Sequence, residues 1–258
     1  MKMEPLISIL IPAYNEEEWI GETLRSICES FAALEHSSYE IIVCDNHSTD
    51  RTSEIAKSKG AQVVFEPHNQ IAKARNAAAK TAKGKLLIFM DADTLLNAQV
   101  LEQTIEHFES GKVGAGGAIP WMHTQGLPWH KKIFVWVCCW LWAKISIGFQ
   151  FAAGSYLYCH REAWVEIGGF NEELYVSEEI DFSKKLKVWC KKRGLTLSII
   201  PAPFIFTSSR KVWWYTPWQG IKQALRILFN PESMKKKDHC HIWYTRPTQN
   251  FVKECSKK

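Results

Sequence analysis

The sequence lacks the cysteine spacings of metal-binding and disulfide-held domains. Its eight cysteines are scattered over 258 residues, and no two of them form a C-x-x-C pair or a zinc-finger spacing. At this length folding buries roughly three-quarters of the surface of the unfolded chain, so a core needs neither disulfides nor a structural metal. We therefore expect reduced thiols, most of them buried, in one globular fold.

The sequence also lacks a leader and a long apolar run. No signal segment with a small-residue cleavage site precedes the first expected strand. The longest apolar run, residues 133–143, has 11 residues, whereas a membrane-spanning helix needs about 20. A cytoplasmic protein is expected from these two absences.

The run at 133–143 is nevertheless rich in Trp and is flanked by Lys131, Lys132 and Lys144. Two alternatives fit this pattern. One is a helix of the protein core. The other is a peripheral helix on the inner face of a membrane, with Trp side chains at the level of the lipid headgroups and lysines beside anionic lipid.

Glycine-rich phosphate loops are absent as well. After the first expected strand the chain reads Pro-Ala-Tyr-Asn-Glu-Glu, at residues 12–17, which is acidic. This segment contains neither the G-x-G-x-x-G of dinucleotide-binding proteins nor the basic, glycine-rich loop of a nucleotidyltransferase. NAD-dependent dehydrogenases and sugar-nucleotide nucleotidyltransferases are therefore disfavoured.

Acidic residues are scarce at one end of the chain. From residue 208 onward there are 11 Lys and Arg against 3 Asp and Glu, within a net charge of +5. We therefore divide the chain into a domain at 1–207 and a basic, aromatic extension at 208–258. The basic tail and the Trp content also suit an RNA-binding protein, but they are the sole support for that remote alternative, and no nucleic-acid partner is expected.

What the sequence does contain is an alternation of strand and helix patterns. This alternation predicts an α/β fold with a mainly parallel central sheet that helices flank on both faces. In the first half strands are expected at 6–12, 39–44, 61–65 and 85–90, with helices at 16–34, 50–60 and 71–83. In the second half strands are expected at 114–120, 152–159 and 195–200, with helices at 161–167 and 177–192.

Polar clusters follow the expected strands, where open α/β sheets bind ligands. Asp91 and Asp93 follow residues 85–90 and are hard oxygen ligands that suit Mg²⁺ or Mn²⁺. The alternative for this pair is an ordinary turn with helix-capping aspartates. Asp45 follows residues 39–44, where its carboxylate could accept a hydrogen bond from a nucleobase.

Five motifs in order resemble glycosyltransferase family 2. They are Ile-Pro-Ala-Tyr-Asn-Glu-Glu at 11–17, Asp-Asn-x-Ser-x-Asp at 45–50, Ala-x-Ala-Arg-Asn at 72–76, Asp-Ala-Asp at 91–93 and Glu-Glu-x-Asp at 178–181. The match covers about the first 200 residues. The resemblance implies a GT-A fold, a Rossmann-like single domain, and an enzyme that transfers a sugar from a nucleotide-diphosphate donor with inversion.

The resemblance also implies a nucleotide site. Pro12, Tyr14 and Glu16 would border the base and ribose, and Asp45 would hydrogen-bond the base, commonly uracil or guanine. Arg75 and Asn76 would lie near the base and the diphosphate. Asp91 and Asp93 would be the ribose and metal contacts, with Mg²⁺ or Mn²⁺ as the cofactor.

The catalytic base that the resemblance implies is the second acidic residue of the Glu-Glu-x-Asp motif. That residue is Glu179, where many family members have Asp, so the choice between Glu179 and Glu178 stays open, with Asp181 as the third acid of the motif. Gly154 and Ser155 resemble the loop on the acceptor side. Arg210 could clamp the departing diphosphate, or could equally face solvent.

The expected function is therefore transfer of a sugar from a UDP- or GDP-sugar to an acceptor hydroxyl or phosphate. The acceptor could be a polyprenyl phosphate or another lipid, in the synthesis of a glycan or cell-envelope polysaccharide. A non-catalytic module of the same fold, which binds a nucleotide sugar or acts as a scaffold, is the alternative. It would tolerate loss of the metal and base carboxylates, and both are present.

Overall fold

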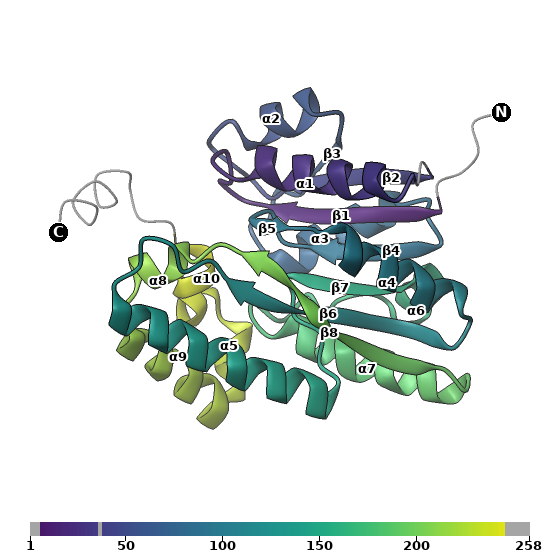
Figure 1. The fold of residues 1–258 in the computed structure, drawn as a ribbon. Helices are drawn as coiled ribbons and strands as arrows, with labels where there is room; N and C mark the ends of the chain where they lie inside the picture. Colours follow the sequence, from purple (N-terminus) through teal and green to yellow (C-terminus); the bar gives the residue numbers. More distant parts are fainter. Residues whose placement is uncertain (1–5, 36–37, 246–258) are drawn as a thin grey trace.

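The computed structural model describes residues 6–35 and 38–245, and in this part of the chain one sheet runs through the molecule (Figure 1). The strand order is β3-β2-β1-β4-β7-β6-β8-β5. The strands are β1 (Ile7–Ala13), β2 (Tyr39–Asp45), β3 (Gln62–Phe65), β4 (Leu86–Met90), β5 (Thr94–Leu95), β6 (Val113–Met122), β7 (Tyr156–His160) and β8 (Thr196–Thr207).

Helices connect the strands and complete the chain beyond β8. They are α1 (Ile20–Ala33), α2 (Thr52–Ser58), α3 (Ile71–Thr81), α4 (Ala98–Glu109), α5 (Trp129–Phe149), α6 (Arg161–Ile167), α7 (Glu178–Lys192), α8 (Arg210–Trp214), α9 (Pro217–Phe229) and α10 (His241–Tyr244). Two 3₁₀ turns, η1 (Pro231–Lys235) and η2 (Lys237–Cys240), lie between α9 and α10.

The sheet has a parallel half and a mixed half. Strands β3, β2, β1 and β4 are parallel, and Leu10 of β1 lies opposite Ile42 on one side and Phe89 on the other. Strand β7 runs antiparallel to both β4 and β6, while β6 and β8 are parallel. The expected α/β single domain is confirmed, with an antiparallel strand inserted at its centre.

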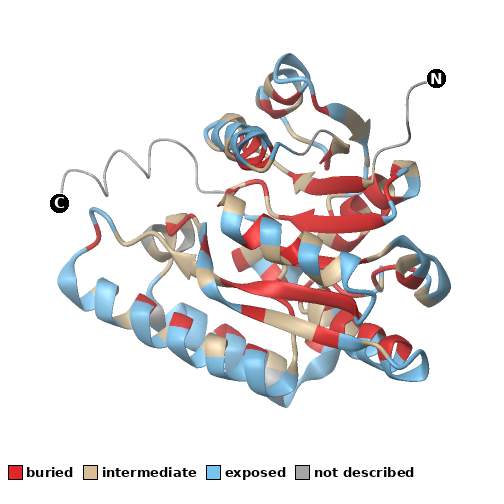
Figure 2. Cartoon of the chain, turned by 45° about the vertical axis from the view of Figure 1, so that its right-hand side comes forward, coloured by how far each residue is buried: buried red, intermediate tan, exposed pale blue. Residues whose placement is uncertain are grey.

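Alternation of side chains along the strands gives the sheet a core on each face (Figure 2). Ile7, Ile9 and Ile11 of β1 pack with α1, α2 and α4 in one apolar cluster. Leu10, on the opposite face of the same strand, packs with α3, α6 and α7 in the other. Both faces of the parallel half are therefore covered, as the continuous apolar runs of its strands require.

Helix α5 belongs to neither core. Of its 21 residues, Val135, Cys139 and Ser146 alone are buried, and they form a stripe along one side. Figure 2 shows most of the rest of this helix as exposed, with some intermediate positions. The core-helix alternative for this segment is therefore wrong.

The chain after β8 returns to the parallel half of the sheet. Cys240 and Tyr244 pack with Val176 in a separate apolar cluster. The Tyr244 hydroxyl donates to the Tyr175 carbonyl oxygen at 2.9 Å, and the Tyr175 amide donates to the Met234 carbonyl oxygen at 2.7 Å. The segment from α8 to α10 is thereby fixed beside the loop that precedes α7.

Candidate active site

A cavity of about 470 Å³ lies at the carboxyl ends of the parallel strands. Strand β1 pairs with β2 on one side and with β4 on the other. The connections that leave β1 and lead to β4 therefore run to opposite sides of β1, and a crevice forms between them at the carboxyl ends of the strands. Ten residues expected from sequence line this cavity: Pro12, Tyr14, Glu16, Arg75, Asp91, Asp93, Gly154, Ser155, Glu178 and Glu179.

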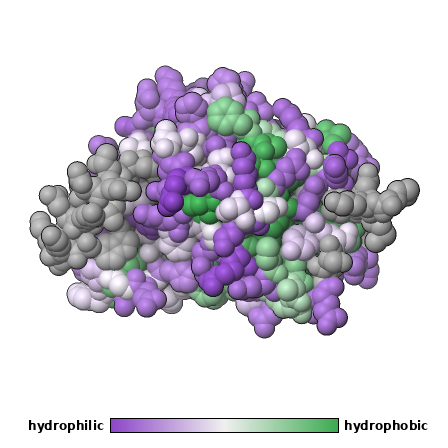
Figure 3. Space-filling view, turned by 90° about the horizontal axis from the view of Figure 1, so that it is seen from above, coloured by the Kyte–Doolittle hydropathy of each residue, from purple (hydrophilic) through white to green (hydrophobic). Residues whose placement is uncertain are grey.

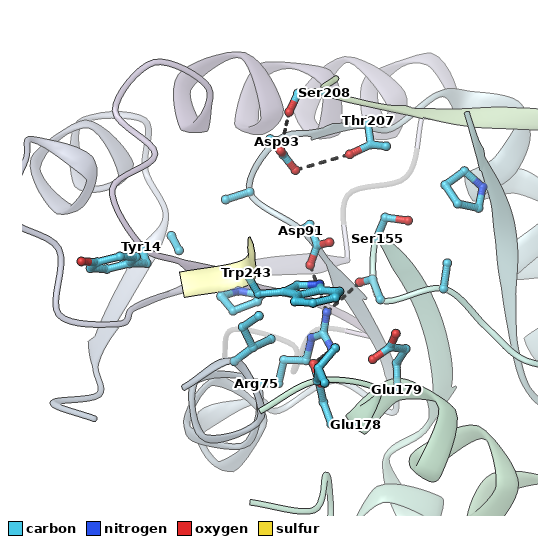
Figure 4. Close-up of a pocket in the computed structure, with 18 of the residues that line it drawn as sticks. Tyr14, Arg75, Asp91, Asp93, Ser155, Glu178, Glu179, Thr207, Ser208 and Trp243 are labelled. Atoms are coloured by element: carbon cyan, nitrogen blue, oxygen red, sulfur yellow. Dashed lines mark hydrogen bonds and ion pairs between the residues drawn. The ribbon is translucent and has the colours of Figure 1, made fainter. Parts of the chain in front are cut away.

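Arg75 of α3 is the buried centre of the site (Figure 4). Its guanidinium donates to Glu178 Oε1 at 2.8 Å, to Asp91 Oδ1 at 3.0 Å and to the Gly154 carbonyl oxygen at 3.0 Å. A Cβ atom at Gly154 would lie 2.6 Å from Arg75 Nη2, so glycine is needed for this close approach. One cation thus joins the end of β4, the start of α7 and the loop before β7.

The two adjacent glutamates of α7 have different environments. Glu178 is buried and its carboxylate is held by Arg75. Glu179 lines the cavity (Figure 4), and burial together with the neighbouring charge of Glu178 raises its pKa to about 8. A carboxyl group with a pKa near neutrality can take up and release protons at physiological pH.

The backbone before these glutamates is in an unusual conformation. Ser177 has φ 63° and ψ 18°, in the left-handed region that side chains other than glycine rarely adopt. Its carbonyl oxygen accepts from the amides of Ile180 and Asp181 and so begins α7. Such outliers persist where the surroundings fix them, and here the turn orients both glutamates at the positive end of a helix.

The second acidic cluster surrounds Asp93. Its carboxylate accepts from the hydroxyls of Ser208 and Thr207 and from the guanidinium of Arg210, which is 3.0 Å away. Arg210 also forms an ion pair with Glu16. The arginine that follows β8 therefore balances the charge of two lining carboxylates, and does not face solvent alone.

Four of the expected site residues are absent from the lining. The side-chain oxygen of Asp45 accepts from the Ser48 amide at 2.9 Å, and Asn76 bonds the Phe170 backbone on the far side of α3. Asp181, one turn of helix from the cavity wall, pairs with Lys185 at 2.8 Å. Arg210 lies behind Glu16 and Asp93.

Several lining residues had no signal in the sequence. Trp243 and Tyr244 come from the far end of the chain, and Figure 4 shows Trp243 beside Arg75 and Asp91. Cys138, Cys139 and Trp142 come from the inner side of α5. Each reaches the cavity through tertiary packing, which a local pattern does not encode.

The donor set of the cavity fits a divalent cation that is shared with a substrate. Asp91 and Asp93 supply two carboxylates, and within residues 6–35 and 38–245 no group of three or more His, Cys, Asp or Glu side chains could hold a metal ion alone. Mg²⁺ and Mn²⁺ commonly take one or two carboxylates and complete their shell with water and substrate phosphates. The pair therefore suits a nucleotide-bound cation better than a structural one.

A crevice at the carboxyl ends of parallel strands, lined by several carboxylates, is typical of an α/β protein that binds its ligand at that edge of the sheet. The chain matches the model of "Glycosyl transferase family 2" over residues 8–164. The chain therefore belongs to glycosyltransferase family 2, and the resemblance stated from its motifs is confirmed.

Curated relatives match less than half of this chain. The UDP-Glc:alpha-D-GlcNAc-diphosphoundecaprenol beta-1,3-glucosyltransferase WfaP of Escherichia coli is 36% identical over 112 residues, which cover 42% of this chain and 43% of that protein. The chain spans less than half the length of the curated relatives it matches.

Solved structures support the fold over most of the chain. The mannosyltransferase PcManGT from Pyrobaculum calidifontis, in complex with GDP-Man and Mn²⁺, has a TM-score of 0.61 at 18% identity and covers 98% of this chain and 68% of that one. S. aureus TarS in complex with UDP-GlcNAc has a TM-score of 0.60 at 20% identity, with coverage of 81% and 59%. The fold is GT-A.

Proposed function

We propose that this chain transfers a sugar from a nucleotide-diphosphate donor to an acceptor hydroxyl, with inversion at the anomeric carbon. The observation that carries the proposal is the position of Glu179, whose pKa is about 8, in the same cavity as Asp91 and Asp93. A base for the acceptor and carboxylates for the donor thus share one cavity, in a chain that belongs to a family of glycosyltransferases.

The proposed reaction is a single displacement. Glu179 takes the proton of the acceptor hydroxyl while the hydroxyl oxygen bonds to the anomeric carbon, and the bond from that carbon to the diphosphate oxygen breaks. The electron pair leaves with the diphosphate. Arg75 fixes Glu178 and Asp91 on either side, which orients the α7 wall toward the donor.

Asp91 and Asp93 would hold a divalent cation together with the donor diphosphate. When bound, Mg²⁺ or Mn²⁺ supplies positive charge that offsets the charge on the leaving group. The structural neighbour PcManGT is described with Mn²⁺ and GDP-Man, which supports this cofactor and a GDP- or UDP-sugar as the donor. The name of WfaP gives a lipid-linked acceptor, which supports a lipid-linked acceptor here.

The test is a panel of UDP-, GDP- and TDP-sugars, with and without Mn²⁺, measured for binding and for hydrolysis. We expect metal-dependent binding of one donor, lost in Asp93→Asn. The control, Glu54→Gln, removes an exposed carboxylate of α2 outside the cavity lining and should bind like the parent. A folded protein that binds no donor contradicts the proposal. Binding without turnover for any acceptor tested would support the scaffold alternative.

A further inference from the structure

The outer side of α5 is a large apolar surface. It exposes Trp129 by 74%, Trp136 by 55% and Phe149 by 61%, together with Ile133, Trp140 and Leu141. A helix that is hydrophobic all round is normally covered on every side, by protein or by lipid. Within residues 6–35 and 38–245, protein buries one stripe of α5 and leaves its outer side exposed, as a surface that a further partner covers would be.

The helix is long enough to cross a membrane, but its contacts favour a different orientation. In the described part of the chain α5 is the one helix that is both long enough and apolar enough to cross a membrane. However, Lys131 near its start donates to the Val212 carbonyl oxygen at 2.9 Å, and Gln150 at its end donates to the Leu197 carbonyl oxygen at 2.9 Å. A span would break these contacts or draw the sheet into hydrocarbon, so α5 lies flat against the domain.

The charged residues of α5 and α9 have one sign. Neither α5 nor α9 contains an Asp or Glu, and both expose cations: Lys132 and Lys144 on α5, and Lys222 and Arg226 on α9. Helix α9 adds two further exposed aromatics, Trp218 at 69% and Phe229 at 80%. Figure 1 shows both helices far from the α2 and β3 end of the molecule.

The surface at the α2 end of the molecule is more polar than the outer side of α5. Figure 3 shows that face as mostly hydrophilic, with hydrophobic residues scattered among polar ones. The molecule is therefore asymmetric: a polar surface at one end, and an apolar, cationic surface on α5 and α9 at the other. Exposed Trp beside Lys and Arg is the pattern of a surface that meets lipid headgroups.

We infer that the outer faces of α5 and α9 form a docking surface for an anionic lipid bilayer. The Trp side chains enter the headgroup region, and Lys132, Lys144, Lys222 and Arg226 contact anionic headgroups. A second copy of the chain fits less well, because a two-fold interface pairs a patch with itself and would bring these cations face to face with no acidic residue of either helix between them.

The docking surface also gives the cavity a position relative to the bilayer. Cys138, Cys139 and Trp142, on the inner side of α5, line the cavity, so one helix separates the acceptor side from lipid. A helix with side chains is about 10 Å across. A lipid-linked acceptor could therefore reach Glu179 without leaving the membrane. This last step rests on the proposed function, whereas the docking itself does not.

The experiment is co-sedimentation of the full chain with vesicles. Vesicles of phosphatidylcholine alone are compared with vesicles that contain about a third phosphatidylglycerol, at low and high salt. The chain is expected to pellet with the anionic vesicles, and less at high salt. The double variant Trp136→Gln, Trp140→Gln is expected to lower the partition coefficient about tenfold. The double variant Lys132→Gln, Lys144→Gln is expected to weaken the salt dependence, since Lys222 and Arg226 remain.

The matched control is Phe65→Gln, which removes an aromatic side chain of similar exposure, 61%, on β3 at the opposite end. It should bind vesicles like the parent, and circular dichroism checks that every variant is folded. Equal pelleting of the Trp variant and the parent, or no binding to anionic vesicles, would overturn the inference. The inference would also be overturned if light scattering showed a dimer of the parent chain that the Trp variant does not form. Donor binding, measured on the same variants, should not change. This measurement distinguishes failure of the docking inference from failure of the proposed function.

Discussion

Two adjacent glutamates, Glu178 and Glu179, have different surroundings in the cavity wall. Glu178 is buried and its carboxylate is bound by Arg75, so it fixes the turn before α7. Glu179, one residue later on the helix, points to the cavity, and burial raises its pKa to about 8. Of the two alternatives that the motif leaves open, we propose Glu179 as the base on this geometry, which sequence spacing does not contain.

The first prediction at this scale concerns turnover. Glu179→Gln keeps the shape of the side chain and removes the base, so we expect kcat to fall about 10²- to 10⁴-fold with donor binding retained. Glu179→Asp, which keeps a carboxylate, should restore part of the rate. The measurement is steady-state kinetics with a separate binding titration of the donor. If Glu178→Gln alone abolished turnover while remaining as stable as the parent, the assignment would be reversed.

The pH dependence of stability gives a second prediction. The pKa of Glu179 is about 8 in the folded chain and about 4.3 in an unfolded one. Between these values the folded state binds a proton that the unfolded state does not, so the contribution of this group is fully present below pH ~4.3 and is lost as the pH rises through 8. Glu179→Gln cannot lose this proton. We expect it to be more stable than the parent at pH 9 and closer to it at pH 5.

Urea unfolding of both proteins at the two pH values measures this difference. Parallel pH dependences for the parent and the variant would mean that Glu179 titrates normally in the folded chain. The same titration of activity should give a kcat/KM that rises with pH toward a plateau above about 8, because the proposed base must be ionised in the free enzyme.

At the scale of elements, the site forms where three segments of the chain meet at Arg75. Helix α3 brings the guanidinium, α7 brings Glu178, and the loop before β7 brings the Gly154 carbonyl oxygen. An extra methyl group at position 154 would be forced against Arg75 Nη2, at 2.6 Å. Because this arginine is buried and bound on several sides, it cannot move away at low cost.

Gly154→Ala is therefore expected to destabilise the fold by about 1–3 kcal/mol, as overpacking of a filled site does. Gly148→Ala on α5 is the matched control, since nothing lies within 4 Å of the added carbon. That control should be neutral, or more stable by about 0.5–1 kcal/mol, because alanine favours a helix interior. Chemical denaturation measures both variants. Equal stability of the two would mean that the Arg75 junction can relax.

The positions of most helices and strands were predictable from the sequence, but the pairing of the strands and the packing of distant segments were not. Local periodicity locates α6 at its observed residues and the first four long strands to within one or two residues, since apolar runs and turn residues are local signals. The antiparallel pairing of β7 between β4 and β6 depends on contacts between residues that are 40 or more positions apart in the chain. The same limit hides Trp243 and Tyr244, whose place in the cavity wall depends on the return of the chain after β8.

For the whole molecule, the boundary expected between residues 207 and 208 gives the last prediction. The two main apolar clusters, one on each face of the sheet, contain no residue beyond Ile205. A fragment of residues 1–207 thus keeps both cores and is expected to unfold cooperatively. It also exposes Ile71, Tyr175 and Val176, which pack against the removed segment, so its melting temperature should be lower than that of the full chain.

The same fragment should fail to bind the donor. It loses Ser208 and Arg210, which bond Asp93, and Trp243, which lines the cavity, so Glu16 and Asp93 lose their shared cation and the cavity loses a wall. Scanning calorimetry and donor titration of both chains separate the two effects. A fragment that folds and binds the donor as the full chain does would make residues 208–258 an appendage to a complete site. A fragment without a cooperative transition would mean that the fold extends past the boundary. The expected result, a fragment that folds but does not bind the donor, would mean that the segment after β8 is part of the site and is not needed for the core.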